Sequence, residues 1–324
     1  MRPFFSIIIP IYNKRPHICR SVGSALNQSF SNIELLAIND ASTDGSLEEL
    51  EKFTDGRIRI LHRSTPGPGG YAARNLGIEN ARGEWIAFLD ADDEWYPYHL
   101  ERMYHLNTQF PNTNFMGCGW EIRDKLIRNL DSYYKKNYHR GNHELDTKTY
   151  LFCYLHGLPP INTSVACVKR SSLKSQNLFP IDVKAQRGGD SYAWFKMICH
   201  HRQMAWSAHL GAIYYQDSVN MVTKYAPSTP YLMRKEIYNE LSLNLNSVEK
   251  ILLKKNLNKK LKYAWVRNIR RGKKNFTLFT KLYWKGDIPN VLKLTLISIL
   301  PSSLINHYLS KRNPKKSKPV DDLY

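Results

Sequence analysis

The chain has 324 residues, of which 42% are hydrophobic and 12% aromatic, and its 47 Lys and Arg against 28 Asp and Glu give a formal net charge of +19. This composition excludes a disordered or collagen-like chain, and the length suits about two domains of ordinary size. Five cysteines, odd in number and without a Cys-x-x-Cys pair, do not support a disulfide framework or a zinc knuckle, so a reducing compartment is expected. The apolar run at the amino terminus is too short for a secretory signal, which favours a cytoplasmic protein.

The first hundred residues alternate between predicted strands and predicted helices. Apolar runs indicate the strands, and apolar residues at helical spacing indicate the helices. The alternation is typical of an α/β fold in which helices cover both faces of a mostly parallel sheet. The predicted strands are 4–9, 33–38, 58–61 and 85–89, and the predicted helices are 15–27, one from about residue 47, and 71–80.

Polar clusters follow three of these predicted strands, after Ile9, after Ile38 and after Leu89. In a parallel sheet the ligand binds beyond the carboxyl ends of the strands. We therefore expect the three clusters to meet in one crevice, although some eighty residues separate the first from the last.

Beyond residue 113 the pattern is weaker, and the Tyr- and Lys-rich stretch 121–150 has no clear periodicity. Apolar runs predict strands at 114–117, 162–168 and 210–215. A helix is predicted over 190–198, where an acidic residue follows two glycines.

Three carboxylates, those of Asp90, Asp92 and Asp93, stand within four residues directly after a predicted strand. So much negative charge is costly unless a cation or hydrogen-bond donors neutralise it. Mg²⁺ or Mn²⁺ suits such a site, because these ions take one or two carboxylates and fill their other positions with water and phosphate oxygens. The alternative is an acidic loop that begins the helix at Pro97.

Two other polar residues have both a functional and a structural interpretation. Asp40 could accept a hydrogen bond from a base or sugar, or it could cap a turn. A Gly-rich loop at 67–70 could deliver Arg74 toward a diphosphate, or Arg74 could lie on a surface helix. The loop does not have the Gly-x-Gly-x-x-Gly spacing of a dinucleotide site.

Four ordered motifs resemble the family-2 glycosyltransferases of GT-A fold: Ser6–Asn13, Asn39–Ser46, Ala73–Gly77 and Phe88–Asp93. The resemblance implies a GT-A, Rossmann-like sheet and transfer of a sugar from a nucleotide diphosphate donor, usually a uridine one, with inversion at the anomeric carbon. It further implies a glycan or glycolipid acceptor in the synthesis of a cell-surface polysaccharide or lipopolysaccharide.

Matching these motifs residue by residue implies roles for individual side chains. Asp92 would ligate the Mn²⁺ or Mg²⁺ that bridges the diphosphate. Pro10, Tyr12 and Asp40 would hold the nucleobase and Asp90 the ribose, with Arg74 near the donor. The implied donor-binding residues are Pro10, Tyr12, Asn13, Asp40, Arg74, Asp90 and Ala91.

The general base of the family lies in a Glu-Asp pair that opens a later helix, with a Trp four residues on. This sequence has Gly189, Asp190 and Trp194, so Asp190 matches the base while the preceding Glu is absent. An inverting transfer needs only one carboxylate to take the proton of the acceptor hydroxyl. The missing Glu leaves open a second interpretation, a catalytically inactive sugar-binding scaffold.

The strong resemblance covers about residues 4–105 and a weaker one continues to about 220. It predicts a catalytic domain followed by a basic amphipathic helical region. The expected boundaries are 1–230 for the catalytic domain, with a donor half of about 1–110 and an acceptor half of about 111–230, and 231–324 for the C-terminal region.

The positive charge is concentrated in the C-terminal region: residues 1–230 hold 26 basic and 22 acidic side chains, whereas residues 231–324 hold 21 and 6. Basic and apolar residues alternate over 250–274, and a basic segment, Lys311–Lys318, follows a more apolar stretch over 284–309. Helices of this kind lie at anionic membrane surfaces.

The longest apolar run, 291–300, is too short to span a membrane, which takes about 20 residues. A peripheral protein on the inner face of the cell membrane is therefore predicted. One alternative is that the apolar face docks on the catalytic domain. Another is a nucleic-acid-binding protein, which gives no role to Asp90, Asp92 or Asp190, so no nucleic-acid partner is expected.

Overall fold

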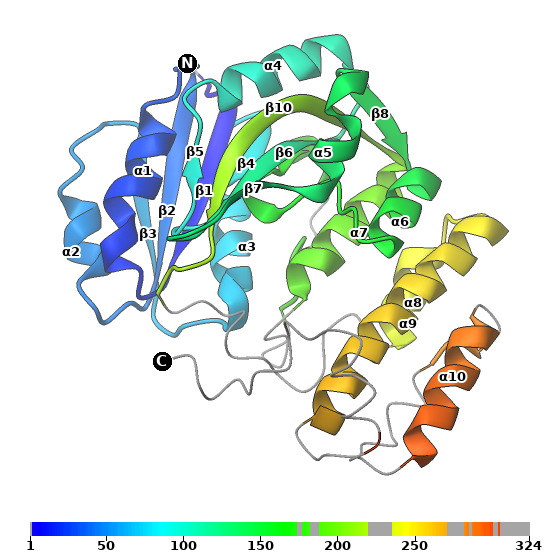
Figure 1. Cartoon of the computed structure of the whole chain (residues 1–324). Helices are drawn as coiled ribbons and strands as arrows, with labels where there is room; N and C mark the ends of the chain where they lie inside the picture. Colours follow the sequence, from blue (N-terminus) through cyan, green and yellow to red (C-terminus); the bar gives the residue numbers. More distant parts are fainter. Residues whose placement is uncertain are drawn as a thin grey trace.

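The structure, a computed structural model, describes residues 2–173, 177–181, 188–219, 235–270, 282–284, 287–300 and 304. Within these residues ten strands form one curled sheet in the order β3-β2-β1-β4-β9-β6-β10-β5, with β7 paired to β6 and β8 paired to β10 (Figure 1). The strands are β1 Phe5–Ile11, β2 Ile33–Asp40, β3 Ile58–Arg63, β4 Trp85–Phe88, β5 Glu94–Trp95, β6 Phe115–Arg123, β7 Arg128–Leu130, β8 His143–Asp146, β9 Cys167–Lys169 and β10 Gln203–Tyr215.

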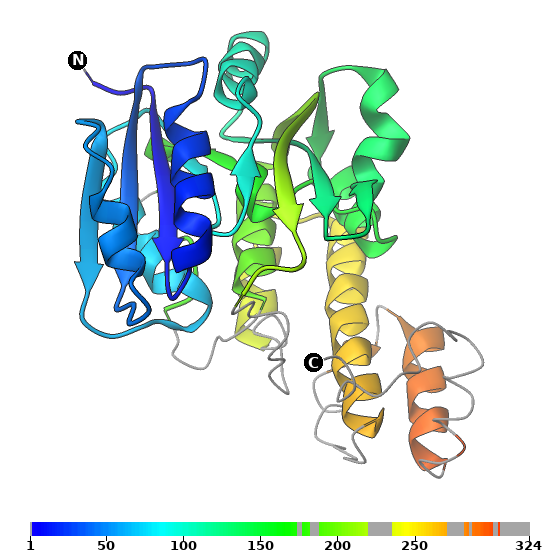
Figure 2. The same ribbon diagram turned by 60° about the vertical axis from the view of Figure 1, so that its left-hand side comes forward.

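Helices flank both faces of the sheet, with α1 on one face and α3 on the other (Figures 1 and 2). The α/β class predicted from the sequence, with helices on both faces of the sheet, is confirmed. The helices are α1 Ile18–Leu26, α2 Ser46–Glu51, α3 Tyr71–Asn80, α4 His99–Gln109, α5 Ser132–Asn137, α6 Thr147–Leu155, α7 Gly189–His201, α8 Lys235–Ser242, α9 Ser247–Arg270 and α10 Ile288–Ile299.

Strands β3, β2, β1 and β4 run parallel to one another. Strands β1 and β2 are buried along almost their whole length, as expected for a parallel sheet covered on both sides. Pro10 lies near the end of the central strand β1, where β4 has already ended at Phe88. The last hydrogen bond from the β4 side goes to Ile8 O, from Leu89 N at 3.1 Å. The missing N–H of Pro10 therefore leaves no sheet partner unpaired.

The second half of the sheet is mixed. Strand β9 is antiparallel to both β4 and β6, whereas β10 runs parallel to β6, so the parallel arrangement belongs to the first four strands. The strand predicted over 162–168 is shorter than expected, because Thr163–Val165 forms a 3-10 turn before β9 begins at Cys167. The stretch 121–150, where periodicity is absent, contains β7, α5 and β8 and the start of α6.

Helix α9 docks its apolar face on the body of the protein, mainly on α6. Leu253, Leu257 and Leu261 are buried there, and burial of each such side chain contributes roughly 1.5–3 kcal/mol. Asn256 Nδ2 donates to Leu151 O at 2.9 Å, which ties the two helices together. The docking alternative for the basic C-terminal region is therefore realised along α9.

Helix α10 differs from α9 because it exposes a row of apolar side chains. Ile288, Leu292 and Leu296 stand four residues apart on α10, and Leu300 and Leu304 continue this spacing in sequence after the helix ends at Ile299. The five side chains are 44% to 66% exposed. No helix among the described residues is long and apolar enough to cross a membrane. The basic segment 311–318 lies outside the described residues.

Candidate active site

The register of the parallel strands brings the predicted site residues together. Ile11 lies opposite Asn39 on β2, and Ile8 lies opposite Phe88 on β4. Continuing each register past the strand ends places Asp40 beside residue 12 and Asp90 beside Pro10. The polar clusters after β1, β2 and β4 therefore share one edge of the sheet, as predicted.

A cleft of about 390 Å³ opens at this edge. Asp190, at the first turn of α7, joins it from the other half of the sheet. Every predicted site residue except Asn13 lines the cleft. These residues are Pro10, Tyr12, Asp40, Arg74, Asp90, Ala91, Asp92 and Asp190, and the lining also includes Ile11, Lys14, Gly67, Gly69, Gly70, Tyr71, Gly188, Ser191, Tyr214 and Lys260.

Asp40 is almost fully buried and attaches the Gly-rich loop to the sheet. Its Oδ1 is paired with Arg63 of β3, and its Oδ2 accepts a hydrogen bond from Gly67 N at 3.0 Å. The structural and the donor-binding interpretations of Asp40 are thus compatible, because a carboxylate with two engaged oxygens still has lone pairs for a further donor.

Arg74 is the cation at the centre of the cleft, and its side chain is only 6% exposed. Its Nη2 lies 2.5 Å from Asp90 Oδ1, and its Nη1 lies 3.6 Å from Asp190 Oδ1 and donates to Gly69 O at 3.0 Å. Burial lowers the pKa of Arg74, but the carboxylates of Asp90 and Asp190 outweigh it and the pKa is raised above its usual value. One guanidinium thus links the acidic loop after β4, the Gly-rich loop and α7.

The side chain of Asp190 is partly exposed, but one of its two carboxylate oxygens is buried. The side chain is 42% exposed, yet Oδ1 is buried and accepts no hydrogen bond from the described residues. Burial raises the pKa of Asp190 to about 6, and the positive charge of Arg74 acts in the opposite direction. A carboxyl group with this pKa is largely ionised at neutral pH and basic enough to accept a proton.

The glycine that stands in place of the family's Glu has a packing reason. Gly189 N donates to Tyr71 OH at 3.0 Å, and a Cβ on Gly189 would lie 2.6 Å from the Tyr71 ring. A glutamate at this position would have to displace Tyr71, which is itself buried against Phe179. The absent Glu thus reflects how α3 meets α7, and it leaves the carboxylate of Asp190 in the cleft.

Asp92, the predicted metal ligand, lies in the cleft with 15% of its side chain exposed. Its Oδ2 is 2.6 Å from Lys14 Nζ, and Lys14 also donates to Val219 O at 2.6 Å. Carboxylate oxygen is the ligand type that Mg²⁺ and Mn²⁺ prefer, and both keep positions for water and phosphate. The residues therefore fit such an ion, which would compete with the Lys14 ammonium for Asp92.

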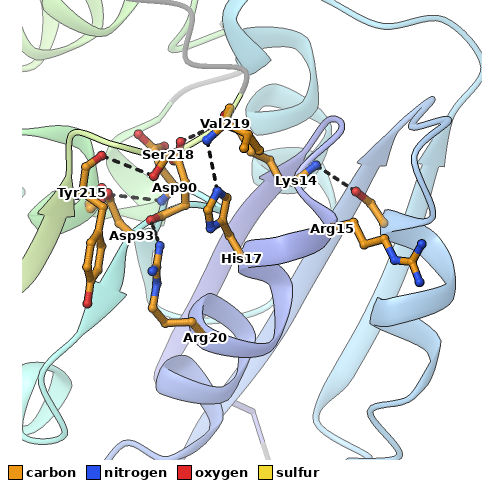
Figure 3. Close-up of polar contacts among 12 residues, drawn as sticks. Lys14, Arg15, His17, Arg20, Asp90, Asp93, Tyr215, Ser218 and Val219 are labelled. Carbon is orange, nitrogen blue, oxygen red and sulfur yellow. Dashed lines mark hydrogen bonds and ion pairs between the residues drawn. The ribbon is translucent and has the colours of Figure 1, made fainter. Parts of the chain in front are cut away.

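The acidic loop is held by contacts from several elements, and Figure 3 shows two of the residues that hold it, Arg20 and Tyr215, near Asp93. Arg20 of α1 donates to Asp92 O at 2.5 Å, and its guanidinium stacks 3.7 Å above the Tyr215 ring. Asp93 is buried and accepts hydrogen bonds from Ser164 Oγ at 2.5 Å and Tyr215 N at 3.3 Å. Burial, and then the charges of Asp92 and Asp90, raise the pKa of Asp93 well above its usual value. Asp93 is thus a supporting residue beneath the cleft.

Asn13 also has a supporting position. Its Oδ1 accepts a hydrogen bond from Thr43 N at 2.8 Å, and its own N–H donates to Ser42 Oγ at 3.1 Å. It joins the loop after β1 to the loop after β2 and lies outside the lining of the cleft.

Sequence reasoning missed Lys260 and Ser191. Lys260 reaches the cleft from α9 and donates to Tyr154 OH at 3.1 Å, and Tyr154 OH in turn lies 2.8 Å from Ser191 Oγ. Lys14 and Arg74 are paired with carboxylates, but Lys260 forms no ion pair with any described residue. No sequence signal marks Lys260 among the many lysines of α9.

Comparisons with known proteins agree with the predicted GT-A-like fold. A crystal structure of Staphylococcus aureus TarS residues 1–349 in complex with UDP-GlcNAc aligns with 97% of this chain and 92% of its own, with a TM-score of 0.70 and 17% identity. This similarity shows a shared fold. An uncharacterized glycosyltransferase of Haemophilus influenzae is 46% identical over 92 residues, 28% of this chain and 37% of that one. Another from Rickettsia typhi is 30% identical over 197 residues, 60% of this chain and 59% of that one.

These relatives are matched over less than two thirds of their own length. Residues 6–157 match the family described as Glycosyl transferase family 2. Residues 6–157 therefore form a glycosyltransferase family 2 domain, as the four motifs predict.

Proposed function

We propose that the protein is an inverting glycosyltransferase that moves a sugar from a nucleotide diphosphate donor, with a uridine nucleotide preferred, to a hydroxyl of a glycan or glycolipid acceptor. The observation that carries this proposal is that Asp40, Asp90, Asp92 and Asp190 line one cleft, in which Arg74 lies beside both Asp90 and Asp190. The UDP-GlcNAc bound to the similar TarS structure supports a nucleotide-sugar donor.

In this proposal the donor lies along the edge of the sheet. Tyr12 and Pro10 contact the base, Asp90 the ribose, and Arg74 holds Asp90 in place. A divalent ion held by Asp92 would stabilise the charge that develops on the departing diphosphate. Asp190 takes the proton of the attacking acceptor hydroxyl, and only this one base is needed for inversion.

Tyr12 provides the first test, because 45% of it is exposed and its replacement leaves the core intact. Stacking of a base on an aromatic ring is worth about 1–3 kcal/mol. We expect Tyr12→Ala to weaken UDP-sugar binding roughly 5- to 100-fold, measured by calorimetric titration with Mn²⁺ present, while Tyr12→Phe retains binding.

Tyr138→Ala is the matched control, since Tyr138 is 54% exposed and lies outside the cleft. A screen of nucleotide sugars by thermal shift would identify the donor first. If no nucleotide sugar raises the melting temperature of the wild-type protein, the proposed activity is wrong.

The acceptor is expected on the side of the cleft formed by Ser191 and Lys260. Lys260→Ala removes a cation that lies beside Asp190 without changing the donor-side contacts. We expect the KM for the acceptor to rise several-fold while the Kd of the donor stays unchanged. A weakened donor Kd in this variant would instead assign Lys260 to the diphosphate.

We further propose that α10 holds the protein on an anionic membrane surface, where a glycolipid acceptor would be found. The exposed row from Ile288 to Leu304 and the basic segment 311–318 support this. Burial of one Leu is worth roughly 1.5–3 kcal/mol, so the double variant Leu292→Ser, Leu296→Ser is expected to reduce sedimentation with anionic vesicles at least about 10-fold.

Leu126→Ser is the control for vesicle binding, because Leu126 is 94% exposed on the turn between β6 and β7. A wild-type chain that stays in the supernatant at low salt would refute the membrane proposal and leave the transferase proposal untouched.

A further inference from the structure

Two histidines and a cysteine meet beneath a second cavity, whose lining shares no residue with the cleft. His99 opens α4, Cys118 lies in β6 and His209 in β10, and one ligand atom from each lies within 4.8 Å of the others. His99 Nδ1 is 3.2 Å from His209 Nε2 and 3.8 Å from Cys118 Sγ. His99 and Cys118 are fully buried.

Gly211 makes this approach possible. A Cβ on Gly211 would lie 2.3 Å from His99 Nδ1 and 2.5 Å from Cys118 Sγ. Real Cβ atoms do not come so close to other atoms, so any other residue here would push the imidazole and the thiol apart. The glycine therefore leaves room for both ligand atoms.

Hydrogen bonds fix which nitrogen of His209 carries its proton. Asn142 Oδ1 accepts from Ala208 N at 3.0 Å and from Ser207 Oγ at 3.1 Å, so the Ser207 hydroxyl proton points to Asn142. Ser207 Oγ then accepts the proton of His209 Nδ1 at 2.8 Å. This leaves a lone pair on His209 Nε2 that faces His99.

Two of the three separations, both measured from His99 Nδ1, are close to those of ligands around one ion, and the third, between Cys118 Sγ and His209 Nε2, is within 4.8 Å. Zinc binds nitrogen at about 2.0–2.1 Å and thiolate at about 2.3 Å, so in a tetrahedral site two nitrogens lie about 3.3 Å apart and nitrogen and sulfur about 3.6 Å apart. The observed 3.2 Å and 3.8 Å differ from these values by little. His209 Nδ1–H also has an acceptor in Ser207 Oγ, and the second ring N–H of a metal-bound imidazole almost always has a hydrogen-bond acceptor.

The cavity beside the cluster supplies access. It has a volume of about 460 Å³, and His209, Tyr98 and Arg102 are among its lining residues. A fourth ligand such as water could therefore reach an ion held by the three side chains.

We propose that His99, Cys118 and His209 bind a thiophilic transition-metal cation, Zn²⁺ or Cu⁺, at a site separate from the sugar-transfer cleft. Two imidazoles and a thiolate suit these ions and not Mg²⁺ or Mn²⁺. On binding, the thiol proton of Cys118 leaves to solvent, the ring proton of His99 moves from Nδ1 to Nε2, and three bonds to the metal form. The cysteine spacing does not reveal this site, because His99 and His209 are 110 residues apart.

The test uses the full chain, stripped of metal and titrated with Co²⁺ and then Zn²⁺. We expect one equivalent of Co²⁺ to produce a thiolate-to-metal absorption band, which Zn²⁺ then abolishes by displacement. Cys118→Ala is expected to lose the band, whereas Cys199→Ala, which removes another buried thiol, retains it. An ion bound at Asp92 gives no such band, because Asp92 offers only oxygen.

Ser207→Ala is a second test that does not depend on the folding of Cys118→Ala, because it leaves all three ligands in place. Loss of an outer hydrogen bond typically lowers metal affinity 10- to 100-fold, so the Zn²⁺ Kd is expected to rise by that factor. Absence of the band in the folded wild-type chain, or a band that survives in Cys118→Ala, would overturn the proposal.

Discussion

The variant Asp190→Asn is expected to lose sugar transfer by a factor of about 10² to 10⁴ while it binds the nucleotide-sugar donor as tightly as the wild type. A positioned general base contributes typically that factor to a rate, and an amide of the same shape cannot accept the proton of the acceptor hydroxyl. The measurement is kcat for transfer, together with the donor Kd from calorimetric titration.

The pH dependence gives this prediction a second readout. Burial raises the pKa of Asp190 to about 6, so the base is ionised above that pH and protonated below it. The transfer rate of the wild type should therefore fall tenfold per pH unit as the pH drops below about 6. Asp190→Asn should show no such limb in its residual rate.

Asp190→Glu is the informative companion, because it keeps a carboxylate in the cleft at a displaced position. It should retain more transfer than Asp190→Asn and still show a limb at acidic pH. If Asp190→Asn keeps wild-type turnover, Asp190 is not the base. The interpretation of the protein as a sugar-binding scaffold would instead require that the wild type itself shows no turnover.

The donor side of the cleft was predictable from sequence because it depends on local rules. Apolar runs mark β1, β2 and β4, and parallel strands end at one edge, so residues following Ile9, Ile38 and Leu89 must meet. Even so, β2 runs two residues further than predicted. Asn39 and Asp40 continue to pair with β3 although they are polar.

The remaining features of the site depend on contacts between distant segments. Lys260 reaches the cleft only because α9 docks on α6, and nothing in the periodicity of α9 specifies its partner. From the sequence, Gly189 in place of the family's Glu left open a catalytically inactive protein. The structure gives this glycine a packing reason, because the Tyr71 ring of α3 leaves no room for a larger side chain. Residues 121–150 gave no pattern because their elements are short.

The pairing of Lys14 with Asp92 leads to an expectation for metal dependence. Asp92→Ala is expected to lower kcat/KM about 10²- to 10³-fold, the loss typical when one group that stabilises developing charge is removed. The 2.6 Å contact to Lys14 means that an entering divalent ion must displace an ammonium group from Asp92. Lys14→Met should therefore tighten Mn²⁺ binding, on the order of 10-fold, because a charge-assisted hydrogen bond is worth about 1.5–3 kcal/mol.

Electron paramagnetic resonance of Mn²⁺ measures this affinity directly and does not depend on turnover. Lys52→Met is the matched control, because Lys52 pairs with Glu49 on the exposed surface of α2 at the same 2.6 Å distance. If Mn²⁺ affinity is unchanged in Lys14→Met but lost in Asp92→Ala, the ion and Lys14 contact the Asp92 carboxylate at the same time and do not compete for it. Equal Mn²⁺ affinity in the wild type and Asp92→Ala would remove Asp92 as the metal ligand, because its carboxylate is the only group in this proposal that holds the ion to the protein.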